Sequence, residues 1–533
     1  MNKINVLLCN EYSQLTSGYS VYGKHLMERL HSHPQLNVAE LAGILHDGQQ
    51  INVPWTVFPV RPNPNDKAAT EEFDSNVNNH YGANRFESTC LKFKPNVVLD
   101  IRDHWMLSFQ ETSPFRKYYS WVIMPTVDAT PQHQEWIHTF MNADGVFTYT
   151  DWGQEELKRH STINLLGSAP PCAEDCFRPM NKKLVRASLG IQDDINIIGT
   201  VMRNQKRKLY PDLFAAFAKF LSLYDGPRTY LYCHTSYPDG WDIPALLIEH
   251  GLMSKVLFTY ICRECGHYTA RFFSGAFTKC DKCRNHTSTL HQLNNGISAE
   301  SLAKIYNTFD VYVQYSTNEG FGIPMVEAAS CGLNVMAIDY SAMTDVVRKI
   351  GGIPLKPLSY SKECESGRLH AVPDNELLTS ELLKYFALPY EIRINKGMRS
   401  EMLCRENYNW NVTTGKWIDA ILQYGQEYKW DQPVSLWQPP SFNLHREKSN
   451  SDYATWLITD VLGQKNMINS SLHIKLIRDL NNQMKRTSWS DYANEHSYFS
   501  KVKFRPFGRK DAYEEIVKMR NWHNHWEQKR AGK

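Results

Sequence analysis

Short apolar runs alternate with amphipathic segments along the first part of this chain. The runs at 4–10, 96–101, 121–127 and 145–150 have the length of strands, and the stretch at 19–30 has the pattern of a helix. Parallel strands that are buried on both faces and alternate with covering helices produce this rhythm. The chain is therefore predicted to be an α/β protein.

A second alternation begins near residue 194 and predicts a second domain of the same kind. Its expected strands are 196–202, 229–234, 256–260, 310–315 and 333–338, with a helix at 212–224. We place the first Rossmann-like domain at 1–180 and the second at 181–425, and we expect the two doubly wound sheets to face one another. A proline-rich stretch at 432–442 opens a C-terminal extension, 432–533.

Length and composition fit this organisation. The chain has 533 residues, of which 42% are hydrophobic and 22% charged, so it can bury sizeable cores and lacks the signature of a disordered protein. No apolar run approaches the roughly 20 residues that cross a bilayer. The first apolar run is also too short for a signal peptide. We expect a soluble, cytoplasmic protein with no membrane span.

Charge is distributed unevenly along the chain. Residues 441–533 carry 17 Lys and Arg against 10 Asp and Glu, whereas the whole chain has a net charge of only +3. Aromatic residues are interleaved with these cations: Trp489, Tyr492, Tyr498, Phe499, Phe504, Phe507, Trp522 and Trp526. Such a surface is able to hold a polyanion such as DNA. The alternative is a solvated helical extension that packs on the main body.

Four of the 12 cysteines have the spacing of a zinc ribbon. Cys262 and Cys265 form one C-x2-C pair, Cys280 and Cys283 form another, and 14 residues separate the pairs. Two such knuckles present four thiolates to one Zn²⁺, and a closed shell of four thiolates is structural because no position stays open for substrate. We place this insertion at 261–285. His267 and His286 are expected to be surface residues, and Tyr268, Phe272, Phe273 and Phe277 to stack bases or to pack a small core.

The segment 316–332 carries two glutamates eight positions apart, Glu319 and Glu327, with a glycine-rich turn between them. It resembles the E-x7-E signature of family 4 retaining glycosyltransferases, which have the GT-B fold. The resemblance implies that Glu319 holds hydroxyl groups of a donor sugar and that Glu327 holds the ribose of its nucleotide. It also places the turn residues Gly320, Phe321, Gly322 and Ile323 against the donor.

A second signature of the same family is a strand that ends in Arg and is followed by Lys after four residues. Here Arg203 and Lys208 have that spacing. The resemblance implies that both cations bind the leaving diphosphate and stabilise the charge that develops on it. Lys206 and Arg207, which lie between them, are expected to be solvated or to face the acceptor.

Weaker matches extend the resemblance over residues 1–425. Gly18 follows the first predicted strand, where the family has a glycine-rich loop near the donor phosphates. Arg102, Asp103 and His104 end the strand at 96–101 and are candidates for the acceptor side. Asp128 lies near the place where many family members carry a histidine, so Asp128 or His104 takes that role or faces the acceptor.

The resemblance implies a retaining transfer from a nucleotide-diphosphate sugar. The acceptor hydroxyl attacks on the face that the diphosphate leaves, with no side-chain nucleophile and no catalytic metal. The ribbon and the basic extension favour a large anionic acceptor. Our specific hypothesis is a hydroxymethylated pyrimidine in DNA, as in phage-type DNA modification, which would place the protein in a host cytoplasm. Two alternatives stay open: a polysaccharide, lipid-linked or small-molecule acceptor, and a non-catalytic GT-B binding protein.

Overall fold

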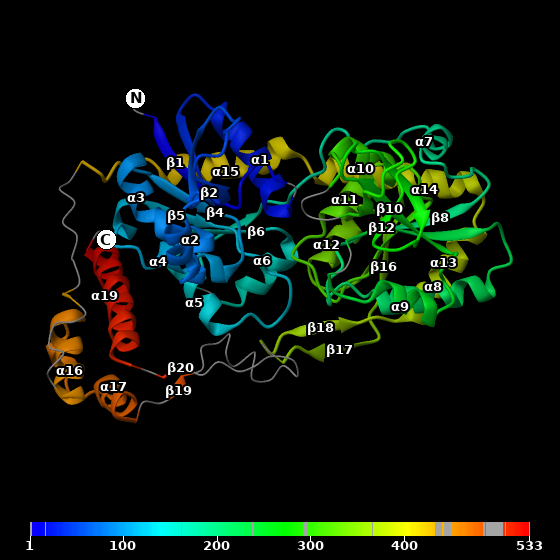
Figure 1. Cartoon of the computed structure of the whole chain (residues 1–533). Coiled ribbons are helices and arrows are strands. Elements are labelled where there is room, and N and C mark those ends of the chain that lie inside the picture. Colours follow the sequence, from blue (N-terminus) through cyan, green and yellow to red (C-terminus); the bar gives the residue numbers. More distant parts are fainter. Residues whose placement is uncertain are drawn as a thin grey trace.

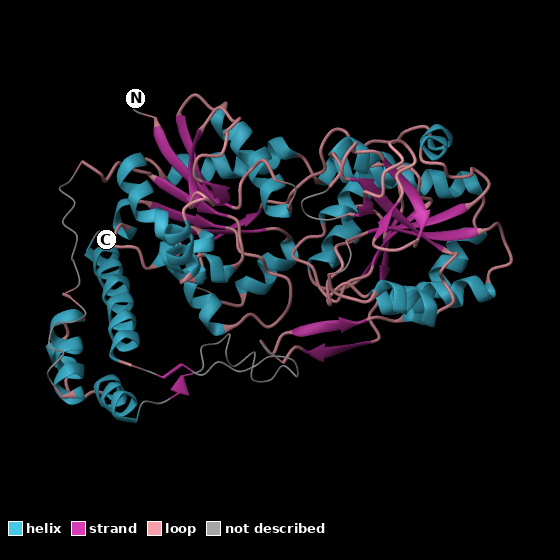
Figure 2. Cartoon of the chain, viewed as in Figure 1, coloured by secondary structure: helices cyan, strands magenta, loops and turns pink. Residues whose placement is uncertain are grey.

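The computed structural model shows two α/β domains side by side and a helical extension (Figure 1; Figure 2). It describes residues 3–15, 17–160, 162–236, 239–291, 296–364, 366–431, 440–441, 449–482, 485–486, 505–506 and 508–531. Among these residues, no helix is both long and apolar enough to span a membrane.

The N-terminal domain is built on a seven-stranded sheet in which all neighbouring strands are parallel. Its strands are β1 (Ile4–Asn10), β2 (Leu36–His46), β3 (Thr56–Arg61), β4 (Val97–Asp100), β5 (Ser120–Ile123), β6 (Gly145–Thr148) and β7 (Leu165–Ser168). Their spatial order is β3-β2-β1-β4-β5-β6-β7. The four runs that the sequence indicated form β1, β4, β5 and β6, and the three remaining strands were not predicted.

Helices connect these strands and cover the sheet. They include α1 (Gly18–His31), α3 (Ala83–Phe93), α5 (Gln134–Asn142) and α6 (Asp151–Lys158). The helix α1 begins directly after the loop that follows β1, because the Ser17 side chain caps it by accepting a hydrogen bond from the Ser20 backbone N–H. This cap fixes the start of α1 at Gly18, at the carboxyl end of the sheet.

The C-terminal domain holds a larger sheet with a parallel body and an antiparallel margin. Its parallel strands are β8 (Asn196–Val201), β9 (Thr229–His234), β10 (Val256–Cys262), β14 (Val311–Gln314), β15 (Val335–Ile338) and β16 (Ile353–Leu355). At the margin, β10 also pairs in antiparallel fashion with β11 (Tyr268–Phe272) and β13 (Ser288–Leu290), and β12 (Phe277–Thr278) pairs with β13. These two domains confirm the predicted fold class of two doubly wound α/β domains.

Both sheets contain a point at which the direction of winding reverses. In the N-terminal sheet, β1 lies beside β4, and in the C-terminal sheet, β8 lies beside β14. Loops diverge at such switch points, and they leave a crevice outside the carboxyl ends of the strands where ligands bind. The loops after these four strands carry most of the residues that the sequence analysis selected.

The end of the second predicted domain departs from our boundary at 425. The helices α13 (Asn375–Ala387) and α14 (Tyr390–Asn407) belong to the C-terminal domain, but α15 (Trp410–Tyr424) packs on the N-terminal domain. In this contact, the Trp417 indole N–H donates to the Tyr22 hydroxyl over 2.8 Å, and Trp417 is fully buried. The chain therefore returns to its first domain, and sequence order alone does not reveal such a return.

The described part of the extension contains α16 (Asn450–Trp456), α17 (Ser471–Asn482) and α19 (Arg509–Ala531) around a small apolar core of their own. The helix α19 lies against the N-terminal domain, where the Asn521 side chain donates to the Thr112 carbonyl over 3.0 Å. The side chains of the eight aromatic residues that we expected to hold a polyanion lie outside the described part of the chain.

Candidate active site

The loops at the two switch points meet across the domain boundary. A side-chain carbon built on Gly18, at the start of α1, would lie 3.7 Å from Ile323 Cδ1 in the other domain. One built on Gly320 would collide with Thr126 Cγ2, which follows β5. Gly320 is therefore needed for the close approach of the two domains, and the glycine-rich turn lies at the junction between them.

Glu319 is the centre of a buried ionic cluster in this turn. Its carboxylate accepts hydrogen bonds from Lys208 Nζ, from Arg207 Nη1 over 2.7 Å and from Gln314 Nε2 over 2.9 Å. Burial alone would raise the pKa of Glu319, but the two cations outweigh it and lower that pKa to about 2. Burial lowers the pKa of Lys208 to about 8 against the opposing attraction of Glu319.

Arg207 was expected to be solvated or to face the acceptor. Its side chain is 38% exposed, and its guanidinium also binds the Glu319 carboxylate and, over 3.0 Å, the Asn318 carbonyl, contacts that the sequence analysis did not anticipate. Sequence spacing does not predict this contact. Arg207 and Lys208 are adjacent in the chain, and the backbone conformation of the loop decides whether each of their side chains reaches Glu319. The loop is held by the pairing of Lys208 with Ser316.

Arg203 lies apart from this cluster. It follows β8 and is exposed, and among the described residues its side chain makes no hydrogen bond or ion pair. Of the two cations that the family signature selected, Lys208 thus contacts Glu319, whereas Arg203 is exposed and lies outside the cluster. Arg203 lies close enough to His291 to lower the pKa of that imidazole.

Glu327 lies on α11 (Ile323–Ser330), the helix that follows the turn. It accepts a hydrogen bond from the Tyr306 hydroxyl over 2.7 Å. Burial, together with the charge of Glu174, raises the pKa of Glu327 to about 7. Gly322, which caps α11, has a φ of +91°, a left-handed conformation that favours glycine. Glu319 and Glu327 lie on either side of Gly322 and have different hydrogen-bond partners.

Two of the acceptor-side candidates lie in the loop after β4, near the junction. Burial raises the pKa of Asp103 to about 6, and the Tyr19 and Thr126 side chains oppose this by hydrogen bonding to its carboxylate. Burial and the charge of Arg368 lower the pKa of His104 to about 3, so this imidazole is neutral at pH 7. The His104 ring lies 3.8 Å from that of Trp136, centroid to centroid.

Arg102, the third acceptor-side candidate, is buried inside the N-terminal domain. Its side chain is 1% exposed, forms a 2.5 Å ion pair with Asp100 and donates to the Tyr81 carbonyl over 2.9 Å. These contacts satisfy the guanidinium inside the N-terminal domain. Arg102 therefore supports the loop that carries Asp103 and His104.

Asp128 joins the two domains. Its carboxylate accepts from Asn318 Nδ2 over 2.7 Å and from Arg368 Nη1 over 2.5 Å. Arg368 lies just before the second strand of a hairpin, β17 (Ser359–Lys362) and β18 (Leu369–Val372), that extends beneath both domains (Figure 1). No motif marks Arg368 in the sequence, and it was not predicted.

Ser341 is a further residue that the sequence analysis missed. It is fully buried, and its hydroxyl accepts from the Glu319 backbone N–H over 3.0 Å. Its φ of +54° is unusual for a residue with a side chain. Ser341 therefore helps to hold the backbone of the glutamate turn.

The four predicted zinc ligands come together at the margin of the C-terminal sheet. Their sulfur atoms all lie within 4.8 Å of one another, with Cys262 and Cys283 3.6 Å apart and Cys265 and Cys280 3.7 Å apart. Tetrahedral zinc with bonds of about 2.3 Å requires sulfur atoms about 3.8 Å apart. The residues present therefore fit a structural zinc ion.

The aromatic residues of the ribbon differ in burial. Tyr268 and Phe273 pack against the core of the C-terminal domain, whereas Phe272 and Phe277 are exposed. The cysteines lie between β10, a strand of the parallel body that ends at Cys262, and β13, which ends at Leu290, beyond the predicted limit of 285. The ribbon is part of the sheet and not a separate module.

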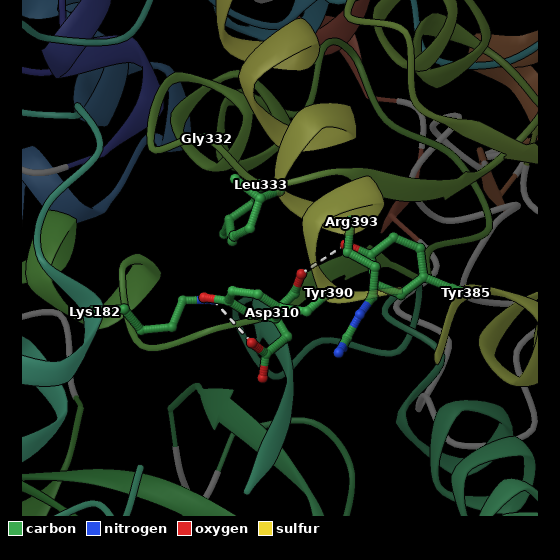
Figure 3. A pocket seen from close by; sticks show the side chains of 8 residues that line it. Lys182, Asp310, Gly332, Leu333, Tyr385, Tyr390 and Arg393 are labelled. Carbon is green, nitrogen blue, oxygen red and sulfur yellow. Dashed lines mark hydrogen bonds and ion pairs between the residues drawn. The ribbon is translucent and has the colours of Figure 1, made fainter. Parts of the chain in front are cut away.

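A pocket elsewhere in the C-terminal domain holds none of the predicted site residues (Figure 3). It is lined by Lys182, Asp310, Gly332, Leu333, Tyr385, Tyr390, Arg393 and Ile394. Asp310 and Leu333 come shortly before β14 and β15, so the pocket lies at the amino ends of the strands, opposite the switch point. Lys182 and Asp310 pair with each other over 2.8 Å.

Known proteins resemble this chain in its fold and in one segment of its sequence. Residues 286–356, which include the glutamate turn, match the family model described as "Glycosyl transferases group 1". No curated protein matches the sequence. Sucrose-phosphate synthase from Thermosynechococcus elongatus has a similar structure, with a TM-score of 0.59, 16% identity and coverage of 79% of this chain and 99% of that chain.

Two more solved structures share the architecture. WaaG, a glycosyltransferase involved in lipopolysaccharide biosynthesis, has a TM-score of 0.52 at 13% identity and covers 78% of this chain and 99% of its own. Anabaena HepE, solved in complex with UDP and glucose, has a TM-score of 0.54 at 12% identity and covers 79% of this chain and 100% of its own. The fold is GT-B. The fold and the matched segment together support a glycosyltransferase.

Proposed function

We propose that this chain is a retaining glycosyltransferase that moves a sugar from a nucleotide-diphosphate donor to an acceptor hydroxyl. The observation that carries the proposal is the ionic cluster of the buried Glu319 and Lys208 with the partly exposed Arg207, at the switch point of the C-terminal sheet and opposite the loops of the N-terminal domain. Lys208 and Arg203, which both lie in the loop after β8, suit a diphosphate, and the Glu319 carboxylate suits sugar hydroxyls.

Donor binding would change the ion-pair partners within this cluster. The diphosphate would take Lys208 and Arg203 as partners, and Glu319 would then be able to accept hydrogen bonds from the donor sugar. Anabaena HepE, solved with UDP and glucose, is a relative of the same fold that supports a donor of this kind. Glu327 would bind the ribose, as the family resemblance implies.

The reaction that we propose needs no covalent enzyme intermediate. The acceptor oxygen forms a bond to the anomeric carbon while the bond from that carbon to the phosphate oxygen breaks on the same face. The hydroxyl proton passes to the departing phosphate. Lys208 and Arg203 stabilise the negative charge on the diphosphate, which is the main contribution of this chain to the rate.

Donor hydrolysis tests this proposal. UDP-, GDP- and ADP-sugars are incubated with the protein, and release of the nucleoside diphosphate is measured. Lys208→Ala and Arg203→Ala should each lower the rate about 100-fold, whereas Lys219→Ala, which removes an exposed cation on α8 (Tyr210–Leu223), should not. Indifference to both site substitutions would contradict the assignment, and no release from any donor would favour the non-catalytic alternative.

For the acceptor, we propose a hydroxymethylated pyrimidine in DNA, as in phage-type modification. The support is the basic extension, whose helix α19 lies on the N-terminal domain, the side that we assign to the acceptor. Mass spectrometry of hydroxymethylated duplex DNA after incubation with activated sugars tests this acceptor. Transfer only to a polysaccharide, lipid-linked or small-molecule acceptor in the same assay would overturn it.

For the four cysteines, we propose a structural zinc site. The sulfur separations of 3.6 and 3.7 Å fit tetrahedral zinc. Four thiolates fill the shell of such an ion, which makes the site structural. Metal analysis of the purified protein should give one zinc per chain. Cys265→Ser should lower that content, and a content unaffected by the substitution would contradict the site.

A further inference from the structure

The last strand of the ribbon returns the chain to the expected donor site. The strand β13 ends at Leu290, and the next residue, His291, pairs with Ser236 just beyond the carboxyl end of β9. The loop after β8 lies at the same edge, because the Asn204 backbone N–H donates to the Ser236 hydroxyl over 3.2 Å. His291 therefore comes from the ribbon but lies among the loops of the C-terminal switch point.

The surroundings of His291 leave part of its imidazole without a partner. Its ring lies 4.8 Å from that of His234, whose Nδ1 is already bonded to the Thr259 hydroxyl over 2.9 Å. In the described part of the chain, Nδ1 of His291 is buried and has no hydrogen-bond partner. A buried polar atom in this condition costs free energy unless a ligand or water satisfies it.

Arg203 is the charged group whose field acts on this imidazole. Burial, together with the charge of Arg203, lowers the pKa of His291 below its usual value, so the ring is neutral at pH 7. A neutral imidazole carries one N–H donor and one acceptor. Beside an exposed guanidinium, such a donor suits an anionic oxygen that Arg203 also binds.

We propose that His291 binds the diphosphate of the donor together with Arg203, and that the four-cysteine ribbon holds it in position. The inference rests on the proposed function, because that function supplies the diphosphate. It assigns a ligand contact to a residue that neither family signature contains. It also gives the ribbon a role in donor binding.

The register of the ribbon explains how the cysteines act on His291. The strand β10 pairs with β13 through Tyr260 with Leu290 and through Cys262 with Ser288. The metal-ligating Cys262 is thus directly opposite a residue three positions before His291. Ser288 and Leu290 are buried, so a metal that fixes the end of β10 also fixes the end of β13.

Calorimetric titration with UDP, GDP and ADP tests the contact. For the diphosphate that the unsubstituted protein binds, His291→Ala should raise the Kd about tenfold, and His291→Gln, which keeps a donor, should raise it less. The Kd of the corresponding nucleoside should stay within twofold. The matched control is His286→Ala, which removes an exposed histidine from the same ribbon.

The titration distinguishes failure of the proposed function from failure of the His291 inference. If the unsubstituted protein binds none of the three nucleoside diphosphates, the proposed function fails and this inference fails with it. If it binds one and His291→Ala binds it equally well, only this inference is overturned. An equal loss of nucleoside and nucleoside diphosphate affinity would also overturn it, because the contact would then lie at the base or the ribose.

Metal removal tests the role of the ribbon. Chelation that releases zinc, measured by its absorbance with a metal indicator, should weaken nucleoside diphosphate binding by the factor seen for His291→Ala. The same chelation should cause no further loss in His291→Ala, because the contact is already absent. Circular dichroism checks that the two domains stay folded. Unchanged affinity after zinc release, or two losses that multiply, would overturn the positioning role.

Discussion

In the protein without a bound donor, cationic side chains of the same chain neutralise the negative charge of Glu319. Its side chain is 7% exposed, and Lys208, at 8%, is as deeply buried. Breaking a buried ion pair by removing one partner is costly, because the remaining charge stays in a medium that solvates it poorly. The cluster therefore contributes to stability when no donor is bound.

Glu319→Gln should lower the free energy of unfolding of the free protein by about 2–4 kcal/mol. The reason is that Lys208 and Arg207 then repel each other without a carboxylate between them. A bound nucleoside diphosphate should restore much of this loss by supplying negative charge. Denaturant titrations with and without UDP measure both effects. The control, Glu376→Gln, breaks an exposed ion pair with Lys219 and should change stability little.

Glu327 gives a prediction about pH. Because burial raises its pKa to about 7 in the folded protein, the folded state holds the proton more tightly than the unfolded state does. This contribution to stability is complete below about pH 4.5 and is lost as the pH rises through 7. In Glu327→Gln, which cannot ionise, the fall in unfolding free energy between pH 5 and pH 8 should be smaller by about 2 kcal/mol. Denaturant titrations at the two pH values measure it, and an equal slope in both proteins would contradict the assignment.

At the scale of the elements, the hairpin of β17 and β18 links the two domains. The Leu369 backbone N–H donates to the Thr130 carbonyl over 2.8 Å, Arg368 binds Asp128, and the Arg368 guanidinium lies 4.8 Å from the centre of the Trp136 ring. The hairpin thus holds the loop that carries Asp128 against the C-terminal domain. If the proposed function is right, the hairpin supports the loop that we assign to the acceptor side.

Arg368→Ala should separate transfer to the acceptor from binding of the donor. We expect transfer to the acceptor to fall about tenfold, because Asp128 loses a charged partner, while the Kd for a nucleoside diphosphate stays within twofold. Steady-state kinetics and calorimetry measure the two quantities. Arg348→Ala is the matched control, since Arg348 is exposed and pairs with Asp339 inside one domain. An equal loss of diphosphate binding would show that the hairpin acts on the donor cluster instead.

At the scale of the molecule, the helical extension has its own apolar core, which includes Trp456, Leu457 and Ile516. Its removal should therefore leave both α/β domains folded. A chain that ends at residue 431 should keep its donor hydrolysis rate and lose DNA binding that weakens steeply with salt. Gel shifts at two salt concentrations, together with the hydrolysis assay, measure these outcomes. DNA binding that survives the truncation would place the anion-binding surface elsewhere.

Much of this organisation was predictable because it depends on short-range patterns. The alternation of apolar runs with amphipathic segments predicted β1, β8, β9 and β14 to within about a residue, because each is a short, almost fully buried run. The strand β3 was missed because Pro59 interrupts it and little of it is buried. The spacing of the four cysteines likewise predicted a cluster, because chelation by two knuckles depends on local geometry.

The sequence by itself determined the α/β class, the two domains and the cysteine cluster, since each depends on residue type and spacing along the chain. Only the tertiary structure decided that Arg207 binds Glu319, that α15 returns to the first domain, that Arg368 reaches Asp128, and that the ribbon brings His291 to the loops after β8 and β9. These contacts join residues far apart in the chain or depend on which way a loop turns. Their energies come from burial and charge pairing in three dimensions, which no local pattern encodes.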